Sequence, residues 1–187
     1  MMERVPVAHV TVTTVADYPT RREPHRAAHI DRLLRLRALG HFVGGGPTPD
    51  GRNAELFYRL PGRLAGPDEV DRVITEDPYH RGGVWSGYTH RLFADFVEPW
   101  DPAPAVVLDG SRPVTLVEGP APDPDLARFA LIELRGQGRL LFGGTFPDGE
   151  TLAVLRASDP AEGLAWLGET GLWAPAALRA RPLLHVL

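Results

Sequence analysis

The stretch that decides the fold is residues 24–51, PHRAAHIDRLLRLRALGHFVGGGPTPDG, because a related stretch recurs 98 residues later as PDPDLARFALIELRGQGRLLFGGTFPDG at 122–149. Ten of the 28 aligned positions are identical. In the first stretch these positions are Pro24, Leu33, Leu36, Arg37, Gly40, Gly45, Gly46, Pro49, Asp50 and Gly51. The alternative is coincidence in a chain rich in these residue types, but the matches keep one frame across hydrophobic, helix-end and turn positions. The sequence therefore predicts an internal duplication.

Both copies predict the same order of elements. In the first copy, residues 5–15 alternate like a strand, and residues 24–40 have apolar residues at helical spacing before a terminating glycine. The remaining elements of this copy are expected as strands at 41–46, 54–60 and within 87–97, and as a helix at 67–75. The second copy predicts elements at 113–117, 126–137, 139–142, 151–157, 161–169 and 183–187. The order β-α-β-β-α-β, found twice, is that of a ferredoxin-like unit and places the chain in the α+β class.

A proline-rich segment separates the two copies. The chain has 187 residues, which is long enough for one large domain or two compact ones. The segment that contains EPWDPAPA interrupts the repeat, so we expect units at 1–100 and 112–187 joined by a linker at 101–111.

Composition excludes several classes of function. The chain is 43% hydrophobic and carries a formal net charge of −4, which favours a globular protein and disfavours a nucleic-acid partner. It contains no cysteine, and all 20 of its basic residues are arginine, so thiol catalysis, thiolate metal sites and lysine Schiff bases are excluded. No apolar run approaches the ~20 residues of a membrane span, and the N-terminal stretch resembles a strand more than a signal peptide. We expect a cytoplasmic protein with no bound cofactor or metal.

The helix at 24–40 carries two unusual polar residues. Ile30, Leu33, Leu34 and Leu36 define its apolar stripe. On a helix of 100° per residue, His29 falls at the edge of that stripe and Arg26 along its middle, so both are expected to face the sheet. An arginine there suits a cavity open to a charged ligand, whereas a histidine at a helix edge is more often structural. Asp31, Arg32 and Arg35 are expected on the solvated helix surface.

Four short motifs of the first copy, taken in order, resemble the YciI-like (YCII-related) family of the dimeric α+β barrel superfamily. The resemblance covers roughly residues 5–100. Its motifs are Arg26-Ala-Ala-His29-Ile-Asp-Arg-Leu33, Gly40-His-Phe-Val-Gly-Gly-Gly-Pro47, Asp77-Pro78-Tyr79 and Gly83-Val84-Trp85. The family's proposed active-site pair is a helix histidine and an aspartate before Pro-Tyr, which the resemblance transfers to His29 and Asp77. Members with assigned chemistry act on small organic rings and include a dehydrochlorinase.

A histidine–aspartate pair suits acid/base chemistry. Imidazole titrates near ~6.5, and a carboxylate on one ring nitrogen fixes the tautomer and orientation, so we expect His29 and Asp77 within ~3.5 Å. Arg26, Tyr79 and Trp85 are the predicted substrate-binding residues, with an ordinary core role as the alternative for the two aromatics. Turn formation is the alternative role for Asp77, because Asp-Pro often begins a turn.

The resemblance also implies how the two copies assemble. In the family, two chains pack their sheets face to face, and a duplication can reproduce this pairing as a barrel inside one chain. The expected state is a pseudo-dimeric monomer, with further homodimerisation left open. The second copy has Ala127 in place of His29 and Pro124 in place of Arg26, and no Asp-Pro-Tyr follows its second helix, so it is expected to lack a site.

The leading function is a small lyase or isomerase that uses a His–Asp acid/base pair on a small anionic or aromatic organic molecule. The alternatives are a metabolite-binding or accessory protein without turnover, and an interaction module without a pocket. A metal site of His25 and His29 with Asp77 or His80 is a weaker alternative, because no recognisable zinc motif accompanies it.

Overall fold

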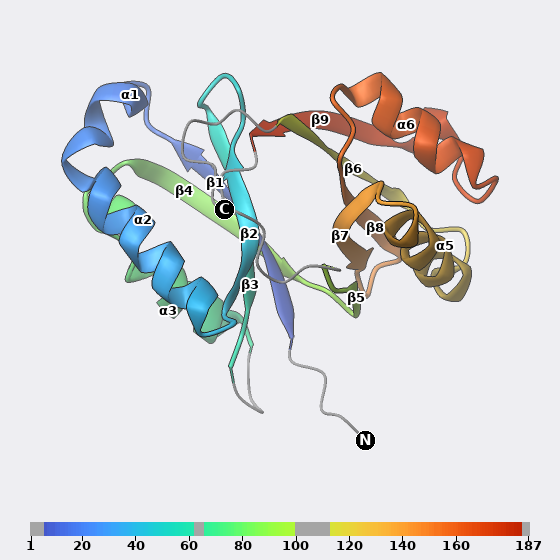
Figure 1. Ribbon diagram of the computed structural model, residues 1–187. Coiled ribbons are helices and arrows are strands. Elements are labelled where there is room, and N and C mark those ends of the chain that lie inside the picture. The colour runs from blue at the N-terminus through green and yellow to red at the C-terminus, as the bar shows by residue number, and fades with distance from the viewer. Residues whose placement is uncertain (1–5, 62–65, 100–112, 185–187) are drawn as a thin grey trace. The chain divides into compact units, whose positions relative to one another are not determined.

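The chain folds into two compact α+β units, which meet in the sequence between Leu92 and Phe93. Figure 1 shows the computed structural model, which describes residues 6–61, 66–99 and 113–184. None of the helices in these ranges is both long enough and apolar enough to cross a membrane.

The first unit is a four-stranded antiparallel sheet with helices on one face (Figure 1). Its strands follow the order β2-β3-β1-β4 across the sheet. Its elements are β1 (Val7–Thr14), α1 (Tyr18–Arg21), α2 (Glu23–Ala38), β2 (Phe42–Pro47), β3 (Asn53–Arg59), α3 (Pro67–Thr75), α4 (Pro78–Arg81) and β4 (Trp85–Leu92). The short helices α1 and α4 are additions to the predicted β-α-β-β-α-β order.

The second unit repeats this topology. Its elements are β5 (Asp95–Val97), β6 (Pro113–Pro120), α5 (Pro124–Gly136), β7 (Leu140–Thr145), β8 (Glu150–Leu155), α6 (Pro160–Glu169), the 3-10 helix η1 (Pro175–Ala177) and β9 (Arg179–Leu184). The strand order is β5-β7-β8-β6-β9, so four strands repeat the order of the first sheet and β5 adds an edge strand beside β7. The predicted α+β class with two βαββαβ units is confirmed.

Matched residues of the two units adopt matched backbone conformations. The pairing of β2 with β3 shifts register between Phe42 and Gly44, and that of β7 with β8 shifts between Leu140 and Phe142, which are the positions 98 residues later. Gly40 and Gly138, each just beyond a helix, have φ values of 76° and 75°. This left-handed conformation is open to glycine at little cost, which explains why both copies carry glycine there.

The expected boundary between the units is wrong by several residues. The strand expected within 87–97 is two strands, and the second of them, β5, pairs antiparallel with β7 of the second sheet. The first unit therefore ends at Leu92, not at residue 100. Local periodicity identifies a strand but does not reveal its pairing partner. The expected linker at 101–111 and residues 185–187 of the last expected strand lie outside the described residues, and β9 begins earlier than expected, at Arg179.

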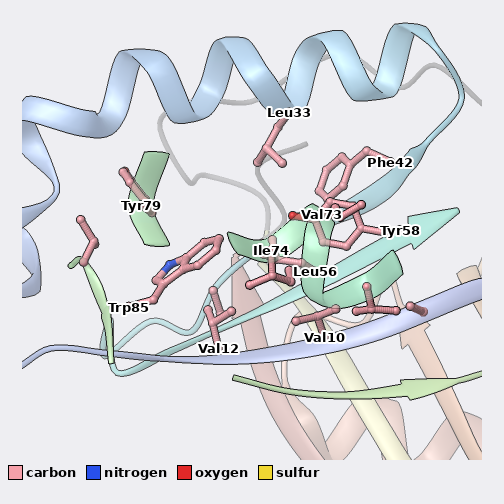
Figure 2. Packing of buried hydrophobic residues seen from close by; sticks show 14 of the residues in the cluster. Val10, Val12, Leu33, Phe42, Leu56, Tyr58, Val73, Ile74, Tyr79 and Trp85 are labelled. Atoms are coloured by element: carbon pink, nitrogen blue, oxygen red, sulfur yellow. The ribbon is translucent and has the colours of Figure 1, made fainter. Parts of the chain in front are cut away.

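The core of each unit lies between its sheet and its helices. In the first unit, Figure 2 shows Leu33 of α2 pointing toward Ile74 of α3, Leu56 of β3 and Val12 of β1. In the second unit, the corresponding cluster joins Leu131 of α5 to apolar residues of β6, β8 and α6. Alternate residues of each strand face these clusters, because side chains along a strand point to opposite faces in turn.

Candidate active site

A buried histidine–aspartate pair lies between α2 and α4 of the first unit. The His29 side chain is 8% exposed and that of Asp77 is 0% exposed, and Nδ1 of His29 lies 2.8 Å from Oδ1 of Asp77. The structure thus brings together the two residues that the sequence analysis paired. A carboxylate that accepts a hydrogen bond from Nδ1 keeps the proton of the neutral ring on that nitrogen and leaves Nε2 as the basic atom.

Asp77 is fixed by its place in the backbone. It is the N-cap residue of α4, and its Oδ1 also accepts a hydrogen bond of 2.9 Å from the backbone N–H of Tyr79. Pro78 occupies the first helical position, where the absent N–H costs nothing. The structural role and the paired role considered for Asp77 are therefore combined in one oxygen atom, and the cap orients the carboxylate toward His29.

Arg32 is a third member of this group, and the expectation that it lies on the solvated helix surface is wrong. Its side chain is only 13% exposed, because it folds inward from α2 and its Nη2 donates a hydrogen bond of 2.8 Å to the carbonyl oxygen of Val73. Its Nη1 lies 3.5 Å from Oδ2 of Asp77. This contact gives the buried carboxylate a positive partner, without which burial of its charge would be costly.

Tyr58 of β3 places a buried hydroxyl near the same group. Burial raises the pKa of Tyr58 well above its usual value, and the negative charge of Asp77 raises it further, so the phenol stays protonated. Three buried polar atoms of this group, Tyr58 Oη, Arg32 Nη1 and Asp77 Oδ2, lack a hydrogen-bond partner among the described residues. The sequence analysis missed both Arg32 and Tyr58. Helical spacing of three residues from His29 could have indicated Arg32, whereas Tyr58 comes from a distant strand.

Two aromatic rings hold the imidazole in place. The His29 and Tyr79 rings stack with centroids 3.9 Å apart and planes 10° apart. Trp85 meets His29 edge-on, with centroids 5.7 Å apart. Both aromatic residues are buried members of the core, and burial raises the pKa of Tyr79 above its ordinary value. They restrict the rotation of His29, whereas contact of either ring with a substrate stays a prediction.

Arg26 and the remaining histidines have different surroundings. Arg26 is half-buried, and its positive charge opposes the rise in the pKa of Tyr79, so it lies within electrostatic reach of the aromatic pair. The His25 ring packs on Gly82, where an added Cβ would overlap it, and the His80 ring lies edge-on to Tyr88. The described ranges contain no cluster of three or more histidine, aspartate or glutamate side chains suited to hold a metal ion.

A second buried histidine–carboxylate pair lies on the sheet of the same unit. Nε2 of His9 in β1 is 2.6 Å from Oε2 of Glu55 in β3, and Thr11 donates a hydrogen bond of 2.8 Å to the same oxygen. Their side chains alternate with the core-facing Val10, so they occupy the face opposite the helices. The sequence offered no partner for His9, because the pairing depends on the register between β1 and β3.

The described residues of the second unit contain no counterpart of this polar group. At the position of His29 it carries Ala127, which is fully buried in an apolar cluster that also contains Leu131 and Trp173. After α6 the chain forms the 3-10 helix η1, whose N-cap makes no side-chain hydrogen bond. The first unit has α4 at this point, capped by Asp77. The polar group of the first unit is thus replaced by apolar packing.

The comparisons with solved structures concern the fold. The structural alignment with a candidate monooxygenase from Lactobacillus acidophilus spans 98% of this chain and 95% of that protein, with a TM-score of 0.59 and 10% sequence identity. The alignment with a candidate monooxygenase from Fusobacterium nucleatum spans 100% of this chain and 94% of that protein, with a TM-score of 0.56 and 11% sequence identity. The alignment with a heme-binding protein from Thermus thermophilus spans 98% of this chain and 92% of that protein, with a TM-score of 0.54 and 14% sequence identity. The chain therefore shares the α+β fold of these three proteins.

No protein-family model and no curated protein sequence matches the chain.

Proposed function

We propose that the first unit is a small enzyme in which His29, oriented by Asp77, acts as a general acid/base on a small anionic or aromatic organic molecule. The reaction class is proton transfer next to a carbonyl group, followed by isomerisation or elimination. The observation that carries the proposal is the 2.8 Å contact between Nδ1 of His29 and the fully buried carboxylate of Asp77. A pair that is buried, capped and stacked has a defined geometry before any substrate binds, which is what acid/base catalysis requires.

The proposed proton path uses only this pair. Nε2 of neutral His29 removes a proton from a carbon next to a carbonyl, and the resulting imidazolium is stabilised by the carboxylate of Asp77. In an isomerisation, His29 returns the proton to another carbon of the same molecule. In an elimination, a leaving group departs with the electron pair, and His29 later releases its proton to solvent. Arg26, one turn before His29 on α2, is the proposed contact for an anionic group of the substrate.

The resemblance of the first unit to the YciI-like family supports this assignment, because the family's proposed pair coincides with His29 and Asp77. We also propose that the chain arose by tandem duplication. The repeated strand order and the matched register shifts support this origin. In this interpretation, the second unit kept its packing residues and lost the site.

Proton exchange in D₂O tests the proposal without knowledge of the natural substrate. Small ketones, enol lactones and hydroxylated aromatic acids are incubated with the protein, and exchange or product formation is followed by proton NMR. Wild-type protein is expected to accelerate exchange of at least one compound. Asp77→Asn is expected to lower the rate by ~10²–10⁴-fold, because the histidine loses its carboxylate partner.

A matched control separates the loss of chemistry from the loss of a helix cap. Asp123 caps α5 of the second unit by accepting hydrogen bonds from the N–H groups of Asp125 and Leu126, and it also precedes a proline. Asp123→Asn should leave the exchange rate unchanged. A folded His29→Gln variant that retains the wild-type rate would show that the pair is not the acid/base group.

The second candidate is a metabolite-binding protein without turnover. The small exposed fraction of His29, 8%, favours it, because a substrate must reach Nε2. Saturable binding of a compound that neither exchanges nor reacts, with equal affinity in wild type and Asp77→Asn, would support this candidate against the enzyme.

A further inference from the structure

Arg32 connects α2 and α3 to the buried carboxylate of Asp77. Its Nη2 donates a hydrogen bond of 2.8 Å to the carbonyl oxygen of Val73 in α3, and its Nη1 lies 3.5 Å from Oδ2 of Asp77. The other oxygen, Oδ1, is the one that accepts hydrogen bonds from Nδ1 of His29 and from the backbone N–H of Tyr79. The two carboxylate oxygens are therefore divided, with Oδ1 serving His29 and Oδ2 facing Arg32.

The net charge of this buried group depends on the protonation of His29. While His29 is neutral, the positive guanidinium of Arg32 and the negative carboxylate of Asp77 cancel. Protonation of His29 would leave a net positive charge on three side chains that are each at most 13% exposed. Burial of a net charge disfavours the charged form, so Arg32 opposes the stabilisation of the imidazolium by Asp77.

Other charged and titratable side chains lie on the elements packed around the pair. They are Arg22 of α1, Arg26 of α2, Glu76 just after α3, Tyr79 of α4 and Tyr58 of β3, while β4 contributes the uncharged Trp85. Burial raises the pKa of both tyrosines, so they stay uncharged at neutral pH. The positive charges of Arg22 and Arg26 oppose this rise in the pKa of Tyr79. Glu76 lies 3.7 Å from Arg32 but is 43% exposed, so it neutralises Arg32 only in part.

We propose that Arg32 is a positioning residue that keeps His29 neutral at neutral pH, so that its Nε2 can accept a proton from a substrate. Arg32 does so by holding Oδ2 of Asp77 and by balancing the charge of that carboxylate. A histidine whose carboxylate partner is not balanced in this way holds a proton over more of the neutral range and is then no longer a base. The inference rests on the proposed acid/base function for its consequence in catalysis, whereas the effect of Arg32 on the charge of His29 is measurable without a substrate.

Nitrogen NMR of the histidine rings tests the proposal. Protein labelled with ¹⁵N-histidine is titrated from ~pH 5 to ~pH 9, and the signals of His29 are identified by their loss in His29→Gln. In Arg32→Gln, the pH midpoint at which the His29 ring becomes charged is expected to rise by ~1 unit or more, because a buried positive charge beside its partner is removed. A midpoint equal to that of wild type would overturn the proposal.

Two further variants separate the charge of Arg32 from its structural contact. Arg32→Lys keeps the positive charge, so its midpoint should stay closer to wild type, and a rise equal to that in Arg32→Gln would contradict the proposal. Arg59→Gln is the matched control, because Arg59 is also partly buried and donates a hydrogen bond of 3.1 Å to the carbonyl oxygen of Gly40. Its midpoint should be that of wild type. Equal rises in Arg59→Gln and Arg32→Gln would show a general effect of arginine loss and overturn the proposal.

Glu76→Gln keeps the proposal testable if the Arg32 variants do not fold, since the Glu76 side chain is 43% exposed. Removal of its negative charge leaves Arg32 less neutralised, so the His29 midpoint should fall, and an unchanged or higher midpoint would overturn the proposal. For a compound that reacts in the exchange assay, the acid limb of the rate profile should move to higher pH in Arg32→Gln by the same amount as the NMR midpoint. Failure of every compound to exchange would count against the acid/base function and would leave the NMR result on Arg32 intact.

Discussion

The two units share a backbone design and differ in what fills the space between helices and sheet. Both have the same order of four strands, the same register shift and the same left-handed glycine after the first long helix. In the first unit that space holds His29, Asp77 and Arg32, whereas Ala127 and Trp173 belong to the apolar core of the second. The topology is therefore specified by apolar and glycine positions, and the polar group can be removed without altering it.

The largest expected effect comes from separating the units. The sheet face turned away from the helices carries Phe57 in the first unit, and Leu116 and Val154 in the second, all of them buried apolar side chains. The resemblance to the YciI-like family implies that a second sheet covers this face, so residues 1–92 expressed alone should dimerise or aggregate. Light scattering coupled to gel filtration measures this. A folded, monomeric fragment would contradict the expected sheet-to-sheet packing.

The next largest effect tests whether matched core positions are equivalent. Leu33 and Leu131 are identical in the aligned repeats and both are buried. Truncation to alanine in either unit should lower the free energy of unfolding by about 2–5 kcal/mol, because each change removes buried methyl groups and leaves a cavity. Urea denaturation followed by circular dichroism measures both variants. A loss below about 1 kcal/mol in one variant only would break the equivalence of the two cores.

The repeat itself was predictable because its signals are local. Glycine positions, apolar spacing and the proline at helix starts depend on neighbours within a few residues, so the order of elements follows from the sequence. The His29–Asp77 contact was also foreseen, but through resemblance to a family, since spacing alone assigns no partner to a helix histidine.

The features that sequence analysis missed all depend on long-range placement. β5 pairs with β7 between residues 46 to 50 positions apart in the chain, and His9 meets Glu55 only through the register of β1 with β3. Arg32 was assigned to solvent because it neighbours Asp31 and Arg35, yet its long side chain turns inward to the carbonyl of Val73. The direction of such a long side chain depends on its tertiary contact, and hydrophobic periodicity gives no information about that contact.

Alkaline titration should separate the units, because all four tyrosines lie in the first unit. Burial raises the pKa of Tyr58 and Tyr79 above the value near ~10 of an unfolded chain. Above ~pH 10 the unfolded state releases protons that the folded state keeps. Stability is therefore fully present below ~pH 10 and falls by up to ~1.4 kcal/mol per pH unit for each such tyrosine.

Absorbance of tyrosinate, followed together with urea denaturation between pH 9 and 11, measures this loss. Tyr58→Phe removes a buried hydroxyl that has no hydrogen-bond partner in the described residues, so the variant should fold and lose stability less steeply with pH. An unchanged slope would mean that Tyr58 does not link ionisation to unfolding.

The smallest expected effect is also the closest test of backbone equivalence. Gly40 and Gly138 have φ values of 76° and 75°, and a Cβ atom added at either would meet nothing within 4 Å. Replacement by alanine therefore adds no clash, and the remaining cost is the left-handed conformation, about 1–2 kcal/mol for a residue with a side chain. Because the two positions share conformation and open surroundings, Gly40→Ala and Gly138→Ala should destabilise the protein equally when measured by urea denaturation. Unequal losses of unfolding free energy in the two variants would show that the two helix ends relax differently. The two glycine positions would then match in conformation but not in their contribution to stability.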